Sequence, residues 1–259
     1  MPLKGRIVIV TGAGSGIGRE TAKLLAAEGT KVAIADVSRS KGESTAEEIL
    51  RTGGQAFFTC TDVSNERSVA EMVERVLASF GPPFGLVNNA GIINPVELTQ
   101  MSLDEWDRIL AVNLRSVYLC TRAVLPLMRN RGEGSIVNIA SVHAYFAFPG
   151  FAAYDASKAG IVALTRTIAL ENGSYQIRAN VICPGYVKTP LVEKQIPQQA
   201  KDLHISEQDV ITKVMLKDTV DQQFTTTTDV AEVALFFASF ESNALTGQSL
   251  IVSHGWYMQ

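Results

Sequence analysis

The stretch TGAGSGIG, Thr11–Gly18, decides the fold of this 259-residue chain. It follows a short run of β-branched residues, and a helical pattern begins at about Ile17 and continues to Glu28. Glycines between a strand and a helix permit a tight turn, and they let the backbone approach a phosphate that the helix N-terminus attracts. The pattern therefore predicts a strand–turn–helix unit that cradles the pyrophosphate of a dinucleotide.

The same alternation of strand and helix patterns recurs along the rest of the chain. Most of the strand patterns are nearly continuous in Val and Ile, which is typical of parallel strands buried on both faces. Further strands are expected at 31–36, 55–60, 85–91, 135–141, 177–185 and 249–253. No repeat, low-complexity tract or linker interrupts this order. The sequence predicts one α/β domain over residues 1–259, doubly wound, with a parallel sheet and helices on both of its faces.

One long segment, residues 189–228, breaks the alternation. It contains no strand pattern and is largely polar, but VITKVMLK (210–217) has apolar residues at helical spacing. A long insertion is either a functional lid or an incidental surface excursion. Because this one follows the C-terminal end of a strand, where parallel sheets bind ligands, we expect a helical lid over the site.

The overall composition excludes several classes of protein. A net charge of −3 provides no basic stripe for nucleic acid and no polybasic patch for a membrane surface. The N-terminal apolar run is too short to span a bilayer and lacks a signal-peptide pattern, so a cytoplasmic location is expected. Cys60, Cys120 and Cys183 lie in apolar runs and are expected to be buried free thiols. The histidines and cysteines show no metal-ligand spacing, and no metal is expected.

Asp36 indicates which dinucleotide would bind. It ends the second predicted strand, 18 residues after Gly18, close to the ~20-residue spacing of the acidic residue in dinucleotide-binding units. A carboxylate there accepts hydrogen bonds from ribose hydroxyls and repels a 2′-phosphate. No Arg or Lys stands at the next two positions, although Arg39 is close. The sequence favours NAD over NADP.

The motif YDASK, Tyr154–Lys158, places a phenol and an ammonium group on the same face of a helix. Such a pair is either an exposed helix face or a proton-transfer device. Oxidation of an alcohol requires loss of its hydroxyl proton, and a tyrosinate can accept it. An unperturbed phenol has a pKa of about 10, which a nearby ammonium would lower. Lys158 is therefore expected to tune Tyr154.

Together these motifs resemble the short-chain dehydrogenase/reductase family over essentially the whole chain. The resemblance includes TGAGSGIG, NNAG (88–91), Asn113, Ser141, the Tyr154–Lys158 pair and CPGYVKTP (183–190), in the family's order and spacing. It implies a single Rossmann-type domain with a seven-stranded parallel sheet, usually in a homotetramer. The implied activity is hydride transfer between NAD(P) and an alcohol or ketone.

The resemblance also assigns roles to individual residues. Ser141 would orient the substrate oxygen, Tyr154 would be the general base, Lys158 would hold the ribose and tune the base, and Asn113 would position a relay water. Thr189 resembles the residue that holds the carboxamide, and Asp62 with Val63 the adenine contact. The implied cofactor-binding set is Gly12, Ser15, Gly16, Ile17, Gly18, Asp36, Asp62, Val63, Asn89, Ala90, Gly91, Tyr154, Lys158, Pro184, Gly185, Val187 and Thr189.

The C-terminal third resembles the 3-hydroxybutyrate dehydrogenase branch, in which polar side chains hold a small carboxylate. His143 and Gln195 match two members of that cluster, and Tyr186 lies in the same candidate substrate site. Ile93 and Phe151 depart from it, because the branch carries an amide and a lysine at those positions. Either a protonated His143 or a lid cation replaces the missing charge, or the substrate is neutral and more apolar.

The resulting hypothesis is an NAD-dependent oxidoreductase that acts on a small secondary alcohol, best a 3-hydroxy acid such as 3-hydroxybutyrate. The alternative is a dehydrogenase or reductase of a neutral substrate, such as a sugar alcohol, an aryl or aliphatic alcohol or a 3-oxoacyl thioester. A non-catalytic NAD(H)-binding regulator would be expected to lack one of the catalytic residues, all of which are present. A sugar-nucleotide epimerase is disfavoured by the glycine spacing and the short C-terminal region.

Overall fold

A single sheet of seven parallel strands forms the centre of the protein in a computed structural model, which describes residues 3–258. The strand order is β3-β2-β1-β4-β5-β6-β7, so the direction of winding reverses between β1 and β4. The strands are β1 (Ile7–Thr11), β2 (Lys31–Asp36), β3 (Gln55–Cys60), β4 (Gly85–Asn88), β5 (Gly134–Ile139), β6 (Ile177–Pro184) and β7 (Ser249–Val252). This architecture confirms the predicted doubly wound α/β fold.

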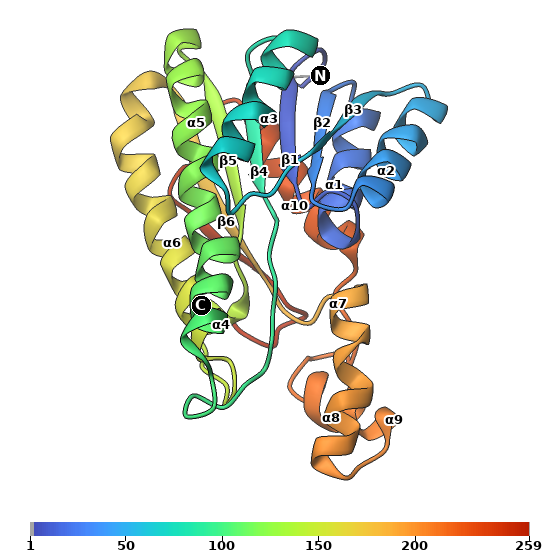
Figure 1. Ribbon diagram of the computed structural model, residues 1–259. Coiled ribbons are helices and arrows are strands. Elements are labelled where there is room, and N and C mark those ends of the chain that lie inside the picture. Colours follow the sequence, from blue (N-terminus) through green and yellow to red (C-terminus); the bar gives the residue numbers. More distant parts are fainter. Residues whose placement is uncertain (1–2, 259) are drawn as a thin grey trace.

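Helices cover both faces of the sheet (Figure 1). Helices α1 (Gly16–Ala27), α2 (Arg39–Arg51) and α10 (Thr227–Ser239) pack in the core on one face. The other face is covered by α3 (Glu66–Ser79), α5 (Ser116–Arg131) and α6 (Ala152–Asn172). The helix α4 (Leu103–Leu110) runs through a π-helical segment, η1 (Ala111–Arg115), into α5, and η2 (Val142–Ala144) and η3 (Gly173–Tyr175) are short 3₁₀ turns. None of the helices in the described chain is long and apolar enough to cross a membrane.

The central strands alternate their side chains between two separate cores. Val8 and Val10 of β1 belong to the core beneath α1 and α10, whereas Ile9 belongs to the core beneath α3 and α5. All residues of β1, β4, β5 and β6 are buried, as expected for parallel strands that are covered on both faces. This rigid centre fixes the ends of the strands, from which the functional side chains project.

The prediction for the cysteines is wrong at one position. Cys120 and Cys183 are buried free thiols, but Cys60 is exposed. It is the last residue of β3, and β3 is an edge strand whose side chains are only partly covered. An apolar sequence run does not distinguish an edge strand from a central one, which explains the error.

The segment after β6 folds into small helices that project beyond the C-terminal ends of the strands (Figure 1). It contains α7 (Pro190–Glu193), α8 (Gln195–Leu203), α9 (Glu207–Asp209) and the π-helical η4 (Val210–Met215). These helices enclose their own apolar cluster, centred on Ile196, Val210, Met215 and Leu216. A bridge between Val187 and Thr225 closes the base of the segment. We refer to residues 189–228 as the lid.

Candidate active site

A cavity of about 660 Å³ lies at the C-terminal ends of the strands. Its wall is formed by residues at or just after the ends of the first six strands in the chain, β1 to β6. Residues of α1, α2, α4, η1 and α6 and the first residues of the lid complete it. It spans the point between β1 and β4 where the winding of the sheet reverses, which is where open α/β sheets bind their ligands. Its position and size suit an extended nucleotide.

The turn between β1 and α1 forms one end of this cavity. Gly12 has φ +63° and Gly16 has φ +54°, conformations that favour glycine. A Cβ atom at Gly12 would lie 2.8 Å from the Cα of Ala90, so the turn also requires the absence of a side chain. Ser15 is the N-cap of α1 but makes no side-chain cap hydrogen bond. The first N–H groups of α1 are therefore not capped by Ser15, and they suit the oxygens of a pyrophosphate.

Gly18 has a structural role within the same turn and does not line the cavity. A Cβ there would lie 2.4 Å from both the carbonyl oxygen of Gly12 and the side-chain nitrogen of Asn89. The Asn89 amide donates to the carbonyls of Thr11 and Gly12, at 3.0 and 3.1 Å. The last glycine of the motif thus allows Asn89 to hold the turn in place.

The neighbouring residue Asn88 links the central strands. Its amide donates to the side-chain oxygen of Asn138 on β5, at 2.8 Å, and lies within reach of Thr121 on α5. This arrangement joins β4 to β5 and to α5 at the centre of the sheet. Buried side-chain amides that are hydrogen-bonded in this way help to fix the relative positions of strands.

Asp36 is held at the end of β2 by two backbone groups. Its carboxylate oxygens accept hydrogen bonds from the N–H groups of Gly14 and Ser38, both at 2.8 Å. The carboxylate therefore faces the glycine turn and lines the cavity. Arg39 does not line it: its side chain pairs with Glu43 at 3.1 Å and lies over the ring of Phe58.

Most of the residues assigned from the family pattern lie together in the cavity wall. Besides Asp36, they are Gly12, Ser15, Gly16, Ile17, Asp62, Val63, Asn89, Ala90, Gly91, Ser141, Tyr154, Lys158, Pro184, Gly185, Val187 and Thr189. The glycine cradle, the acidic strand end and the cavity size all fit a dinucleotide whose nicotinamide end reaches Ser141 and Tyr154.

Tyr154 and Lys158 lie at this end of the cavity, and burial dominates their electrostatics. The Lys158 ammonium lies 5.4 Å from the centroid of the Tyr154 ring and donates to the carbonyl of Ile139 at 3.0 Å. Burial raises the pKa of Tyr154 to about 12, an effect that the Ser141 hydroxyl partly offsets. Burial lowers the pKa of Lys158 to about 8. Burial is the largest cause of the shift in the Tyr154 pKa. The tuning of Tyr154 by Lys158 therefore stays a prediction.

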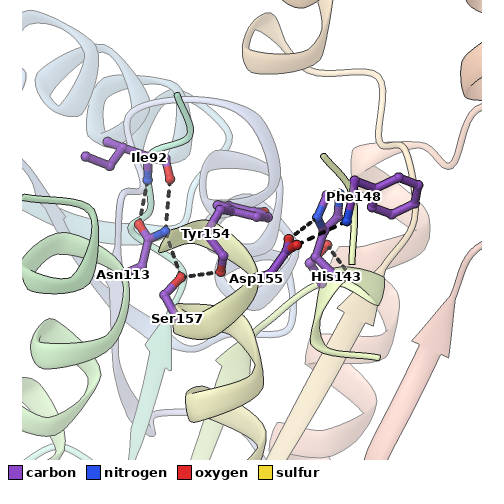
Figure 2. A network of polar contacts seen from close by, with 8 residues as sticks. Ile92, Asn113, His143, Phe148, Tyr154, Asp155 and Ser157 are labelled. Carbon is purple, nitrogen blue, oxygen red and sulfur yellow. Dashed lines mark hydrogen bonds and ion pairs between the residues drawn. The ribbon is translucent and has the colours of Figure 1, made fainter. Parts of the chain in front are cut away.

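Asn113 supports α6, the helix that carries Tyr154 and Lys158, from the centre of η1 (Figure 2). Its side chain accepts from the N–H of Ile92 at 2.8 Å and donates to the carbonyl of Ile92 at 2.9 Å. It also donates to Ser157, whose hydroxyl in turn donates to the backbone carbonyl of Tyr154. The amide of Asn113 is thus committed to joining the loop after β4 to α6, and Asn113 itself does not line the cavity.

His143 forms a short contact with Asp155, beside Tyr154 (Figure 2). The two side chains meet at 2.6 Å between Nδ1 and Oδ1, and the second carboxylate oxygen of Asp155 accepts from the N–H of Phe148. The imidazole lies edge-on to Tyr154, with ring centroids 5.1 Å apart, and close to the rings of Phe148 and Phe151. Asp155 was not anticipated as a partner, since the sequence separates it from His143 by a loop.

The remaining candidate substrate residues occupy different surroundings. Tyr186 stacks on Trp256 of the C-terminal segment, with centroids 5.0 Å apart, and joins the apolar cluster of the lid. The amide of Gln195 donates to the carbonyl of Leu191 within the lid. None of Ile93, His143, Phe151, Tyr186 and Gln195 belongs to the wall of the 660 Å³ cavity, which Ile92 lines instead of Ile93.

The structure adds residues to the cavity wall that the sequence analysis missed. Three are cations that no motif marks, Lys41 of α2, Arg108 of α4 and Lys194 between α7 and α8. Lys41 stands five positions after Asp36, on the first turn of the following helix, and that spacing could have indicated it. Among the described residues, no group of three metal-ligating side chains is assembled.

The chain matches a family model described as Enoyl-(Acyl carrier protein) reductase over residues 12–257. It is 38% identical to the D-beta-hydroxybutyrate dehydrogenase of Rhizobium meliloti (strain 1021), over 98% of this chain and 99% of that protein. It is 36% identical to a 3-oxoacyl-[acyl-carrier-protein] reductase of Thermotoga maritima, over 98% of this chain and 99% of that protein. It is 35% identical to a cyclopentanol dehydrogenase of a Comamonas strain, over 97% of this chain and 96% of that protein.

A solved structure supports the same relationship. The crystal structure titled Ribose-5-phosphate Isomerase from Brucella melitensis 16M superposes with a TM-score of 0.86 at 33% identity, covering 98% of this chain and 93% of that one. Family model, relatives and fold agree over nearly the full length. The chain therefore belongs to the short-chain dehydrogenase/reductase family of oxidoreductases.

Proposed function

We propose that the protein is an NAD-dependent dehydrogenase that transfers a hydride between a small secondary alcohol, or its ketone, and the nicotinamide. The observation that carries this proposal is the assembly of Ser141, Tyr154 and Lys158 at one end of a cavity whose other parts contain the glycine turn and Asp36. A non-catalytic regulator would not need these three side chains together at the nicotinamide end. The bound nicotinamide would supply the hydride chemistry, and the protein would supply the proton chemistry.

In this proposal each side chain has a separate task. Ser141 is held by the short turn that follows β5, where its hydroxyl accepts from the N–H of His143 at 3.2 Å. It can donate to the substrate oxygen and orient it towards Tyr154. Tyr154 takes the alcohol proton during oxidation and returns it during reduction. Lys158 supplies positive charge beside the phenol as the phenolate develops.

The surroundings of Asp36 support NAD as the cofactor. The carboxylate is fixed by two N–H groups at the position expected for the ribose hydroxyls. Arg39, the cation that could favour a 2′-phosphate, is paired with Glu43 and is directed away from the cavity wall. Lys41 lines the cavity near Asp36 and is the remaining group that could tolerate NADP.

Replacement of Asp36 tests this assignment of the cofactor. Asp36→Ala should raise kcat/KM with NADP relative to NAD by at least about tenfold, because the repulsive carboxylate is gone while Lys41 remains. Asp36→Ala combined with Lys41→Met should lose most of that gain. Steady-state kinetics with both cofactors provide the measurement. A wild-type protein that already prefers NADP would contradict the assignment.

Two classes of substrate are compatible with the relatives. The dehydrogenase of Rhizobium meliloti, by its name, acts on 3-hydroxybutyrate, a carboxylate. The other two relatives, by their names, act on cyclopentanol and on 3-oxoacyl groups joined to a carrier protein. Neither of these substrates carries the free carboxylate of 3-hydroxybutyrate. For this chain the departures at Ile93 and Phe151 favour the second class.

We further propose a homotetramer, as the family pattern implies. Several large apolar side chains are exposed on helices that border the sheet, among them Leu170 of α6, 86% exposed, and Phe236 of α10, 48% exposed. Exposed apolar side chains on separate faces suit a protein that buries more than one face against copies of itself.

A further inference from the structure

We propose that the substrate site selects uncharged hydroxy and keto compounds with an apolar group beyond the reacting carbon, such as esters or thioesters of 3-hydroxy acids, over the free acids. This inference rests on the proposed dehydrogenase function. It is carried by the charge of the His143–Asp155 pair and by the aromatic residues around it.

The His143–Asp155 pair offers no net positive charge to a substrate. A protonated His143 beside an ionised Asp155 sums to zero, and a neutral His143 beside the same carboxylate sums to −1. The contact of 2.6 Å joins side chains that are only 9% and 14% exposed, so little solvent intervenes. A substrate carboxylate next to this pair would meet a neutral or repulsive partner. The hypothesis that a protonated His143 replaces the missing lysine therefore loses its electrostatic basis.

An aromatic wall occupies the surroundings in which the hydroxybutyrate branch holds its polar cluster. We define this wall as Phe146, Phe148, Phe151, Tyr186 and Trp256. Phe148 and Phe151 pack on His143 at 4.7 and 5.2 Å, and Trp256 lies 5.7 Å from Phe148 and 5.0 Å from Tyr186 between ring centroids.

The aromatic wall adjoins the cavity at Gly185. This residue lines the cavity, and a Cβ built on it would lie 3.4 Å from the indole of Trp256. At the other side, His143 contacts the ring of Tyr154, and Phe148 and Phe151 of the aromatic wall pack on His143. The rings thus lie directly behind the cavity wall at these two points. A substrate that places its oxygen between Ser141 and Tyr154 therefore has apolar surroundings beside it, which favour an apolar group.

Of the other cations in the cavity wall, Lys41 lies beside Asp36 at the glycine-turn end of the cavity. The remaining three differ in what they contact. Lys158 donates to the Ile139 carbonyl and serves Tyr154. Arg108 lies 3.7 Å from Glu105, a carboxylate that also accepts from Asn94. Lys194 lines the cavity from the exposed surface of the lid, and it is the one of these three that makes no ion pair or side-chain hydrogen bond within residues 3–258. Lys194 is thus the alternative source of charge, which the experiment has to test.

The test compares two pairs of compounds that share a carbon skeleton: acetoacetate with methyl acetoacetate in reduction, and 3-hydroxybutyrate with its methyl ester in oxidation. The expected result is a kcat/KM at least about tenfold higher for the uncharged member of each pair. A higher value for the acids would overturn the inference. If that preference for the acids disappears in Lys194→Gln, the lid lysine supplies the charge.

Two variants locate the source of the selectivity. Phe151→Lys should shift the acid-to-ester ratio towards the acid more than Phe151→Met, which removes the ring without adding charge. Asp155→Asn should shift the ratio in the same direction, since it removes a negative charge from beside His143. Both members of a pair use the same Tyr154, so the ratio cancels changes in proton transfer or in the amount of folded protein. Unchanged ratios in both variants would contradict the proposed role of the pair.

Failure of the proposed function is distinguished by a binding measurement. If the protein binds NADH but turns over neither member of either pair, the dehydrogenase assignment fails for these compounds. Calorimetric titration of the protein–NADH complex with acetoacetate and with methyl acetoacetate then decides the inference separately. Tighter binding of methyl acetoacetate supports selectivity for uncharged substrates. Equal or tighter binding of acetoacetate overturns it.

Discussion

At the scale of single residues, burial disfavours the charged forms of the two groups proposed to take part in proton transfer, Tyr154 and Lys158. Burial raises the pKa of Tyr154 to about 12 and lowers that of Lys158 to about 8. The site therefore holds a neutral phenol beside an ammonium that is costly to desolvate. Groups of this kind are typical of functional sites, where stability is sacrificed for reactivity.

The buried ammonium makes a testable contribution to stability. Because the Lys158 pKa falls from 10.5 to about 8 on folding, the unfolded chain binds more protons between these values, and stability rises with pH through that window. Lys158→Met should therefore be more stable than the wild type at pH 7, by roughly 3 kcal/mol at most, and the difference should shrink towards pH 10.

Urea unfolding at several pH values would measure this difference, with Lys201→Met on the exposed face of α8 as the control. The control removes a charge of the same kind from the surface, so its difference from the wild type should change little over the same window. A Lys158→Met difference that is constant with pH would show that burial does not perturb this ammonium.

At the scale of elements, the turn between β1 and α1 determines whether a phosphate can approach. Its glycines meet two separate requirements, a positive φ and the lack of a side chain. Gly12 has both, with the Cα of Ala90 at 2.8 Å from a built Cβ. Gly53, at the turn after α2, has φ +83° but no atom within 4 Å of a built Cβ.

These two glycines form a matched pair of variants. Gly12→Ala and Gly53→Ala should both lose about 1 kcal/mol of stability from the left-handed conformation. Gly12→Ala should in addition weaken NADH binding by at least about tenfold, since the added methyl displaces the segment of Asn89 and Ala90 that lines the cavity. Fluorescence titration with NADH provides the measurement. Equal NADH affinity in the two variants would contradict the assigned role of the turn.

Local patterns in the sequence predicted the elements and much of the site, for a physical reason. Buried parallel strands, the glycine turn and the acidic residue at the end of β2 each depend on residues that are close in the chain. The exposure of Cys60 depends on the position of β3 at the sheet edge, which only the assembled sheet defines. The contact between His143 and Asp155 likewise depends on how the loop 144–151 folds back onto α6.

At the scale of the whole molecule, the apolar side chains on the surface predict self-association. Leu170 on α6 and Phe236 on α10 lie on opposite faces of the sheet, so a tetramer could bury both. Light scattering coupled to size-exclusion chromatography should give the mass of four chains.

Surface variants test which helices lie in the interfaces between subunits. Leu170→Glu or Phe236→Glu should each reduce the mass, because a charge in an apolar interface is costly to bury. Arg51→Glu, at the exposed end of α2, is the control, because it changes a charge at a position that is already polar, and it should leave the mass unchanged. A monomeric wild-type protein would contradict the tetramer.

The central claim is that Tyr154 accepts the alcohol proton in an NAD-dependent hydride transfer. The most direct test is the rate at which the NADH absorbance band appears when purified wild type and Tyr154→Phe are each mixed with NAD and a turned-over secondary alcohol. Loss of the phenol should slow NADH formation by a factor of about 100 or more, while NADH binding stays close to that of the wild type. A Tyr154→Phe protein that forms NADH at the wild-type rate would contradict the assignment.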